Sequence, residues 1–244
     1  MDWTKAKSIL IVALLVTNLV LISAYFLQNN GQKNDDREMQ DVTVKLLEQK
    51  NIFVNTDIPK EHPRMAKLTV RYDKMNETAV EEQLAAQKAL PDHEPTDDEL
   101  ISMTTEFITK CNLMTENVTF DSIDRKGPDI LVTYKNYIKG IAIEDSYIVC
   151  TVRDGKIVDF KRHWLNPVET GSIEKEVIPA GAALIKFMGE NSANEKIYLE
   201  GISLVYWLDS SAFDAESPVT DTAFPAWKIT YNNGKCRYIL AWEQ

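Results

Sequence analysis

The residue types that most often bind metals or catalyse reactions are scattered along this chain. Its three histidines, His62, His93 and His163, lie far apart, and no pair has the HxxxH or HExxH spacing of a zinc site. Carboxylates gather at Asp97-Asp98-Glu99, where the first turn of a predicted helix favours negative charge. The sequence has no glycine-rich phosphate loop and no GxSxG or SxxK motif. We therefore expect no enzyme activity, no metal and no cofactor.

Two adjacent aromatic residues, Tyr206 and Trp207, are the next candidates for a functional surface. They fall in a run that alternates like a strand, so their side chains point to opposite faces of the sheet. Because aromatic residues favour strands in any case, most of the tryptophans and tyrosines here are expected to be core. One member of this pair nevertheless points away from the core, which makes the pair a weak candidate for partner binding.

Residues 8–27 read SILIVALLVTNLVLISAYFL and contain no charged side chain. A helix of this length spans about 30 Å, the thickness of the hydrocarbon core of a bilayer, so we expect a transmembrane helix. Lys5 and Lys7 precede it, which favours a cytoplasmic N-terminus, residues 1–7, and an extracellular C-terminal domain. A cleaved signal peptide is the alternative, but its apolar stretch would be only about 7–15 residues long.

The polar side chains of Thr17, Asn18 and Ser23 lie inside this apolar run. A polar group at bilayer depth is stabilised when it hydrogen-bonds across a contact between two helices. We therefore take these residues as candidate partner contacts inside the membrane. The competing interpretation for Asn18 is a tolerated amide that bonds the backbone of its own helix.

Charge and cysteine content limit the partners and the redox chemistry. The chain has 244 residues and a formal net charge of −10. An acidic domain repels polyanions, so we expect no nucleic-acid partner. The three cysteines, Cys111, Cys150 and Cys236, form no CxxC motif. We expect buried free thiols, with one disulfide plus a spare thiol as the alternative.

Hydrophobic periodicity predicts an α+β ectodomain. After a polar stalk at residues 28–34, residues 35–95 combine helices with short strands. Thr96 and Glu99 form a capping-box pair that opens a helix with an apolar face extending to Cys111. Strands follow this helix, with a hairpin turn at Asp154-Gly155 and Pro167 as the end of the unit.

The same order of elements then recurs. Pro179 suits the start of a second helix, and strands with a turn at Asn233-Gly234 follow it. The hairpins TVRDGKIVDFKRHW and TYNNGKCRYILAW share a Thr, a Gly-Lys pair and a terminal Trp. We interpret residues 96–170 and 171–244 as two tandem units of one helix and one antiparallel sheet. Chance similarity of the hairpins, and a single sheet across both halves, are the alternatives.

The opening MDWTKAKSILIVALL and the stretch VKLLEQKNIFVNTDIPKEHPRMAKLTVRY resemble the YycI family, as do DGKIVDF and FPAWKI. The resemblance implies an exported α+β domain on one transmembrane helix. It also implies an accessory regulator of the WalK/WalR (YycG/YycF) two-component system that is paired with the related protein YycH. The transmembrane helices are then expected to take part in controlling the sensor kinase and, through it, cell-wall metabolism.

The sequence therefore predicts a non-enzymatic, single-pass membrane regulator of a sensor histidine kinase. Its expected partners are a WalK-like kinase and a YycH-like protein, in a homo- or heterodimer. The first alternative is an anchored extracellular module that binds a protein or peptide, and the second is a cell-wall hydrolase.

Overall fold

The computed structural model describes residues 14, 17, 18, 40–86, 94–191, 195–208 and 220–242. The helices are residues 40–48, α2 (Glu77–Ala86), α3 (Asp97–Lys110) and α4 (Ala180–Glu190). The strands are β1 (Ile52–Val54), β2 (Arg64–Met65), β3 (Leu68–Asp73), β4 (Val118–Lys126), β5 (Asp129–Ile138), β6 (Ile141–Arg153), β7 (Lys156–Thr170), β8 (Lys175–Glu176), β9 (Ile197–Trp207), β10 (Thr220–Tyr231) and β11 (Lys235–Leu240). This mixture of helices and a large, mostly antiparallel sheet confirms the predicted α+β class.

The predicted transmembrane helix and stalk fall almost wholly outside the described residues. Of residues 8–34, only Leu14, Thr17 and Asn18 are described, and they are helical and exposed. Ser23 is not among the described residues. Across the part of the chain that is described, no helix combines the length and the apolar character needed to cross a membrane.

Local sequence signals set several element boundaries as predicted. The Glu99 N–H donates to Thr96 Oγ1 at 3.3 Å and the Thr96 N–H donates to Glu99 Oε2 at 2.9 Å, so the capping box opens α3. Asn51 has a φ of 60°, which ends the helix at residues 40–48 before β1 begins. Asp154 and Gly155 both have positive φ, as a two-residue hairpin turn between β6 and β7 requires.

Nine strands form one sheet, in which eight follow the order β1-β9-β10-β3-β7-β6-β5-β4. The ninth strand, β11, pairs with residues 226–231 of β10 on the edge opposite to β9. The strands β2 and β8 pair separately as a short ribbon. The predicted order of a helix before antiparallel strands occurs twice, with α3 before β4–β7 and α4 before β9–β11. Both sets of strands belong to the same sheet, which is the single-sheet arrangement that the sequence left open.

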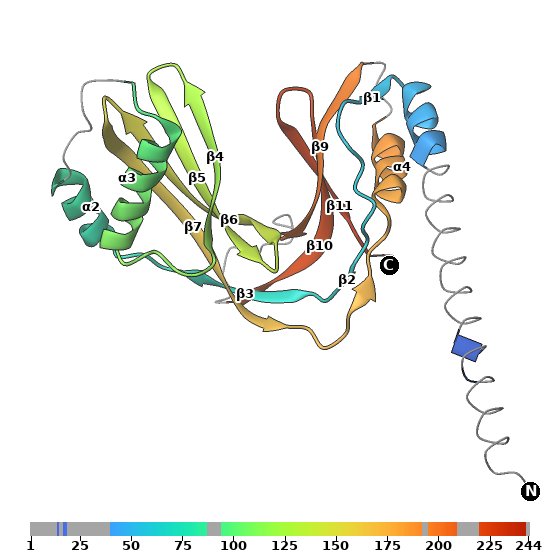
Figure 1. Cartoon of the computed structure of the whole chain (residues 1–244), viewed down its shortest axis with the longest axis horizontal. Coiled ribbons are helices and arrows are strands. Elements are labelled where there is room, and N and C mark those ends of the chain that lie inside the picture. The colour runs from blue at the N-terminus through green and yellow to red at the C-terminus, as the bar shows by residue number, and fades with distance from the viewer. Residues whose placement is uncertain are drawn as a thin grey trace, which may run out of the picture.

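Two long-range pairings join the halves of the sheet. The strand β3, from the N-terminal part of the chain, lies between β7 and β10, and β6 pairs in parallel with β9. The pairings therefore close a circuit from β6 through β7, β3, β10 and β9 back to β6. In Figure 1 the β4–β7 strands and the β9–β11 strands form two lobes that meet near β3 and the β5–β6 hairpin.

Each half of the sheet has its own hydrophobic core. The helices α2 and α3 cover β5, β6 and β7, where Leu100 and Phe107 pack with Val132 and Phe160. The helix at residues 40–48 and α4 cover β9, β10 and β11, and Phe187 of α4 is fully buried there. The burial of aromatic and branched side chains in these two cores supplies the main favourable free energy of folding.

Two local predictions were wrong. We expected Pro167 to end its unit, but β7 continues to Thr170 because the proline sits where the register with β3 shifts, a bulge that tolerates a missing N–H. We expected three buried thiols, and although Cys111 and Cys150 are buried and free, Cys236 is free and exposed. Cys236 lies on β11, where the first three residues are all exposed.

Candidate functional site

A groove of about 680 Å³ lies where the two halves of the sheet meet. One wall is the extended segment at residues 59–66, and the other is the tip of the β5–β6 hairpin at residues 138–141. Its floor is formed by Ile202, Ser203 and Leu204 of β9 with the aromatic rings of Tyr206 and Trp227. A concave, largely apolar site of this size is where a partner side chain or segment binds most readily.

The aromatic residues of the floor are held by their own contacts. The Trp227 Nε1–H donates to the Ile178 carbonyl at 2.8 Å, and the ring is 1% exposed. Tyr206 is buried, and this burial, followed by the negative charge of Glu174, raises the pKa of its phenol. The groove therefore offers an apolar floor whose phenol stays neutral at physiological pH.

The structure separates Tyr206 from Trp207, as the predicted strand alternation requires. Tyr206 faces the groove, whereas Trp207 stacks on Tyr238 with ring centroids 5.2 Å apart and planes 7° from parallel. Trp207 thus contacts β11, the strand beyond β10, on the face of β9 opposite to Tyr206. Of the two predicted ectodomain residues, only Tyr206 lines the groove.

The tip of the β5–β6 hairpin is a groove wall that we did not predict from the sequence. Ile138 pairs with Ile141, and the intervening Lys139 and Gly140 have φ values of 49° and 81°. Two positive φ values in a two-residue loop match the twist of the flanking strands. The Lys-Gly pair between apolar runs is the signal that could have identified this turn.

Behind the hairpin tip, β6 bends away from β5. Lys135 pairs with Tyr147 while the next residue, Asn136, pairs with Ile143, so the residues from Glu144 to Ser146 have no partner on β5. Ser146 Oγ accepts from the Leu165 N–H at 3.0 Å, and Asn136 Nδ2 donates to the Leu165 carbonyl at 2.8 Å. These side chains replace backbone pairing at the bend and free the start of β6 to pair with β9.

The bend places Glu144 in a polar cluster that links both halves of the sheet. Its carboxylate is ion-paired with Lys228 of β10, lies 3.4 Å from Lys135 of β5 and accepts from the Tyr238 hydroxyl of β11 at 3.1 Å. Burial acts to raise the pKa of Glu144, but the hydrogen bond and positive charges of the lysines outweigh it and hold that pKa below its usual value. Burial, followed by the negative charge of Glu144, raises the pKa of Tyr238.

Asp121 on β4 belongs to the same polar cluster and extends it to the edge strand of the sheet. Asp121 Oδ1 accepts from the Tyr137 hydroxyl at 2.8 Å, and its other oxygen lies 4.0 Å from Lys135. Burial, followed by the hydrogen bond to Asp121, raises the pKa of Tyr137 to about 12. The contacts of this cluster therefore join β4, β5, β6, β10 and β11 around the bend of β6.

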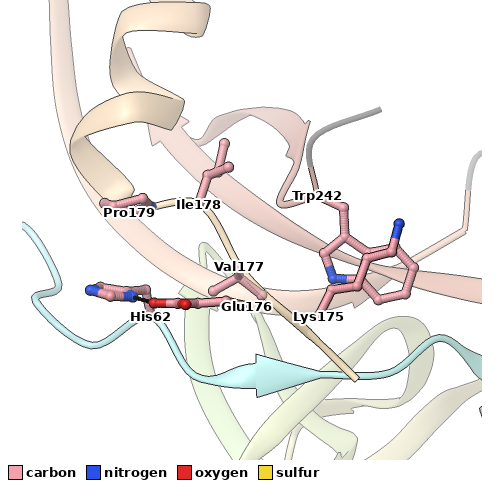
Figure 2. A pocket seen from close by; sticks show the side chains of 7 residues that line it. All are labelled: His62, Lys175, Glu176, Val177, Ile178, Pro179 and Trp242. Carbon is pink, nitrogen blue, oxygen red and sulfur yellow. Dashed lines mark ion pairs between the residues drawn. The ribbon is translucent and has the colours of Figure 1, made fainter. Parts of the chain in front are cut away.

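A smaller pocket of about 270 Å³ lies beside the β2–β8 ribbon at the start of α4. Figure 2 shows His62 and Glu176 paired at one end, 2.9 Å apart, with Lys175 near the Trp242 ring at the other. The Lys175 ammonium lies 5.6 Å from the centre of that ring. His62 and Lys175 each contact another residue of the lining, whereas the buried Trp242 Nε1–H has no hydrogen-bond partner among the described residues. Because the groove has more than twice the volume of this pocket, we take the groove as the candidate binding site.

The prediction that the chain has no metal site was based on the wide spacing of its three histidines. His62 pairs with Glu176, His163 Nδ1 contacts the Asp145 carbonyl, and His93 lies outside the described residues. Among the described residues, no group of three or more His, Cys, Asp or Glu side chains could hold a metal ion. The expected transmembrane contacts Thr17 and Asn18 are helical and exposed.

These features define an α+β domain with one large, mostly antiparallel sheet and a groove at its junction. Residues 30–240 match the family described as YycI protein, so the chain belongs to the YycI family. This confirms the resemblance seen in the sequence and indicates a role as a regulator of the YycG (WalK) two-component system.

Other comparisons add little on function. No curated protein matches the chain. Among solved structures, the Bacillus megaterium YpeB C-terminal domain is similar, with 12% identity, a TM-score of 0.38 and 64% of each chain covered. The chain thus spans about two thirds of the length of that domain, a similarity too distant to assign a function.

Proposed function

We propose that this chain is a non-enzymatic, membrane-anchored accessory regulator of a WalK-like sensor histidine kinase that acts together with a YycH-like protein. The single observation that supports it most is the family match, which extends over residues 30–240. The apolar run at residues 8–27 and the lysines before it support an anchor with the C-terminal domain outside the cell.

In this proposal the chain biases the kinase between two arrangements of its transmembrane bundle. A regulator shifts such an equilibrium only through contacts that differ between the two states. Thr17, Asn18 and Ser23 are the polar positions in the span that could supply such contacts. The ectodomain would contribute further contacts through the groove at the sheet junction.

Chemical cross-linking in native membranes, followed by purification of the chain and mass spectrometry, tests the partner assignment. The proposal expects both the sensor kinase and a YycH-like protein among the cross-linked species. A chain lacking residues 35–244 but keeping the anchor is the control for ectodomain contacts. Recovery of neither partner from cells that express all three proteins would contradict the proposal.

The second candidate function is an anchored extracellular module that binds a protein or peptide without using its anchor. The groove with its apolar floor favours this alternative. Replacing residues 8–27 by an unrelated single-pass helix separates the two functions. Full control of kinase output after the exchange would favour the ectodomain module, and loss of control would favour the proposed role of the transmembrane contacts.

A further inference from the structure

The outer edge of β9 is paired at both ends but open in its middle. On this edge β1 pairs with residues 197–199 and β6 pairs with Val205 and Tyr206. No described strand pairs with residues 200–204 on this edge, although the other edge of β9 is paired with β10 from Gly201 to Trp207. The gap exists because β1 ends at Val54, where the Asn55 N–H makes the last bond to the Leu199 carbonyl at 3.1 Å.

The open stretch of β9 lies on the floor of the groove. Ile202, Ser203 and Leu204 all line it, although consecutive residues of a strand point to opposite faces. The groove therefore reaches the edge of the strand, where backbone N–H and C=O groups are exposed, and not only one face of the sheet. Unpaired backbone groups at a sheet edge are a template for an added strand.

Charged side chains line both walls of the groove: Lys139 is at the hairpin tip, and Glu61 and Arg64 are in the segment at residues 59–66. Lys139 and Glu61 lie on opposite sides of the groove, and both are exposed. An occupant with an acidic side chain near Lys139 would complement the wall at the hairpin tip.

We infer that the edge of β9 at residues 200–204 binds an extended segment of a partner protein by strand addition within this groove. The segment carries apolar side chains at every second position, which contact Leu204 and Tyr206, and backbone groups that pair with β9. Flanking β1 and β6 both run parallel to β9, so the segment fills a gap of about five residues in an otherwise continuous edge. The inference rests on the proposed function only in that the partner is an extracellular domain of the signalling complex.

Site-specific photo-cross-linking of the full-length chain in native membranes tests this inference. The cross-linking amino acid replaces Ser203, which is exposed in the groove, and as a control it replaces Tyr198, which is 42% exposed on β9 outside it. We expect position 203 to cross-link to the extracellular part of a different membrane protein about tenfold more than position 198. Mass spectrometry should locate the cross-links within one short stretch that alternates apolar and polar residues.

Two variants sharpen the result. Leu204→Arg places a charge on the apolar floor and should lower the cross-linking yield at position 203 by about tenfold. Lys139→Glu reverses a charge at the hairpin tip and should lower the same yield by about threefold. Lys156→Glu reverses an exposed charge at the start of β7, after the Asp154-Gly155 turn, and should leave the yield unchanged. Near-ultraviolet circular dichroism of each variant checks that it is folded. If Leu204→Arg does not fold, Lys139→Glu still tests the site.

The outcomes separate this inference from the proposed function. Cross-links from position 203 that reach only a second copy of the chain, or none above the control, would overturn strand addition by a partner. If the kinase still co-purifies in that case, the proposed function stands without it. A mapped strand from a protein unrelated to the kinase or to a YycH-like protein would support the binding mode and contradict the proposed function.

Discussion

The carboxylate of Glu144 on β6 is ion-paired with the ammonium of Lys228 on β10, and this contact ties the two halves of the sheet together at the bend of β6. Only 10% of the Glu144 side chain and 19% of the Lys228 side chain are exposed. Backbone pairing between β5 and β6 is interrupted at this bend, so side-chain contacts fix the bend and, with it, the hairpin tip that forms one wall of the groove. The stability of the bend therefore depends on one buried carboxylate.

Glu144→Gln should lower the free energy of unfolding by about 2–3 kcal/mol at pH 7, because Lys228 loses its counter-charge and Lys135 keeps only Asp121, while the side-chain volume is kept. Urea unfolding followed by tryptophan fluorescence measures the change. The matched control is Glu106→Gln, which removes an exposed pair with Lys110 on α3 and should change nothing measurable. Equal effects of the two substitutions would contradict a structural role for the Glu144 cluster.

The contribution of Glu144 should also depend on pH in a defined direction. Its pKa in the folded chain lies below the ordinary value of 4.5, so the ionised form favours folding. The stabilisation is complete above pH 4.5 and is lost as the pH falls through the lower, folded value. The difference in unfolding free energy between the natural chain and Glu144→Gln should therefore shrink from pH 5 to pH 3. A difference that stays constant over this range would show that charge is not its origin.

The three thiols should react at very different rates. Cys111 and Cys150 are buried, and burial raises the pKa of each thiol, so their reactive thiolates are scarce. Cys236 is exposed on β11. A thiol-specific reagent at pH 8 should modify Cys236 alone in the folded chain, and all three cysteines once the chain is unfolded in denaturant. Modification of Cys150 in the native chain, read by mass spectrometry, would contradict the described packing.

Local signals in the sequence predicted local structure well. The capping box at Thr96, the apolar face that ends at Cys111 and the turn at Asp154-Gly155 each depend on residues close together in the chain. Their energetics are therefore visible in a short window. The same reasoning identified the class of fold and the opposite orientations of Tyr206 and Trp207.

The groove could not be predicted, because it is made by segments that only the sheet topology brings together. Nothing local indicates that β3 enters between β7 and β10, or that β6 bends at Glu144 to reach β9. Such pairings are set by packing between distant strands and not by propensity. Tyr206 was found from its alternation in the strand, whereas Lys139 and Glu61 had no distinguishing pattern.

Asn18→Leu tests whether polar contacts in the span carry the regulatory signal. If Asn18 hydrogen-bonds a partner helix, the substitution removes a contact of about 1 kcal/mol and should alter the output of the kinase severalfold or less. A reporter gene under the response regulator measures the output. Leu14→Ile, a change between apolar residues in the same span, is the control. An output identical to that of the natural chain would remove Asn18 from the mechanism.

The most direct test of the central claim is reconstitution in liposomes. The purified sensor kinase is assayed for autophosphorylation alone, with the YycH-like protein, and with the YycH-like protein plus this chain. As a regulator acting by contact, the full chain should change the phosphorylated fraction severalfold over the kinase with the YycH-like protein alone, and a chain with Leu204→Arg and Asn18→Leu together should change it less. A phosphorylated fraction that is the same with and without the full chain, in vesicles shown to contain all three proteins, would contradict the account.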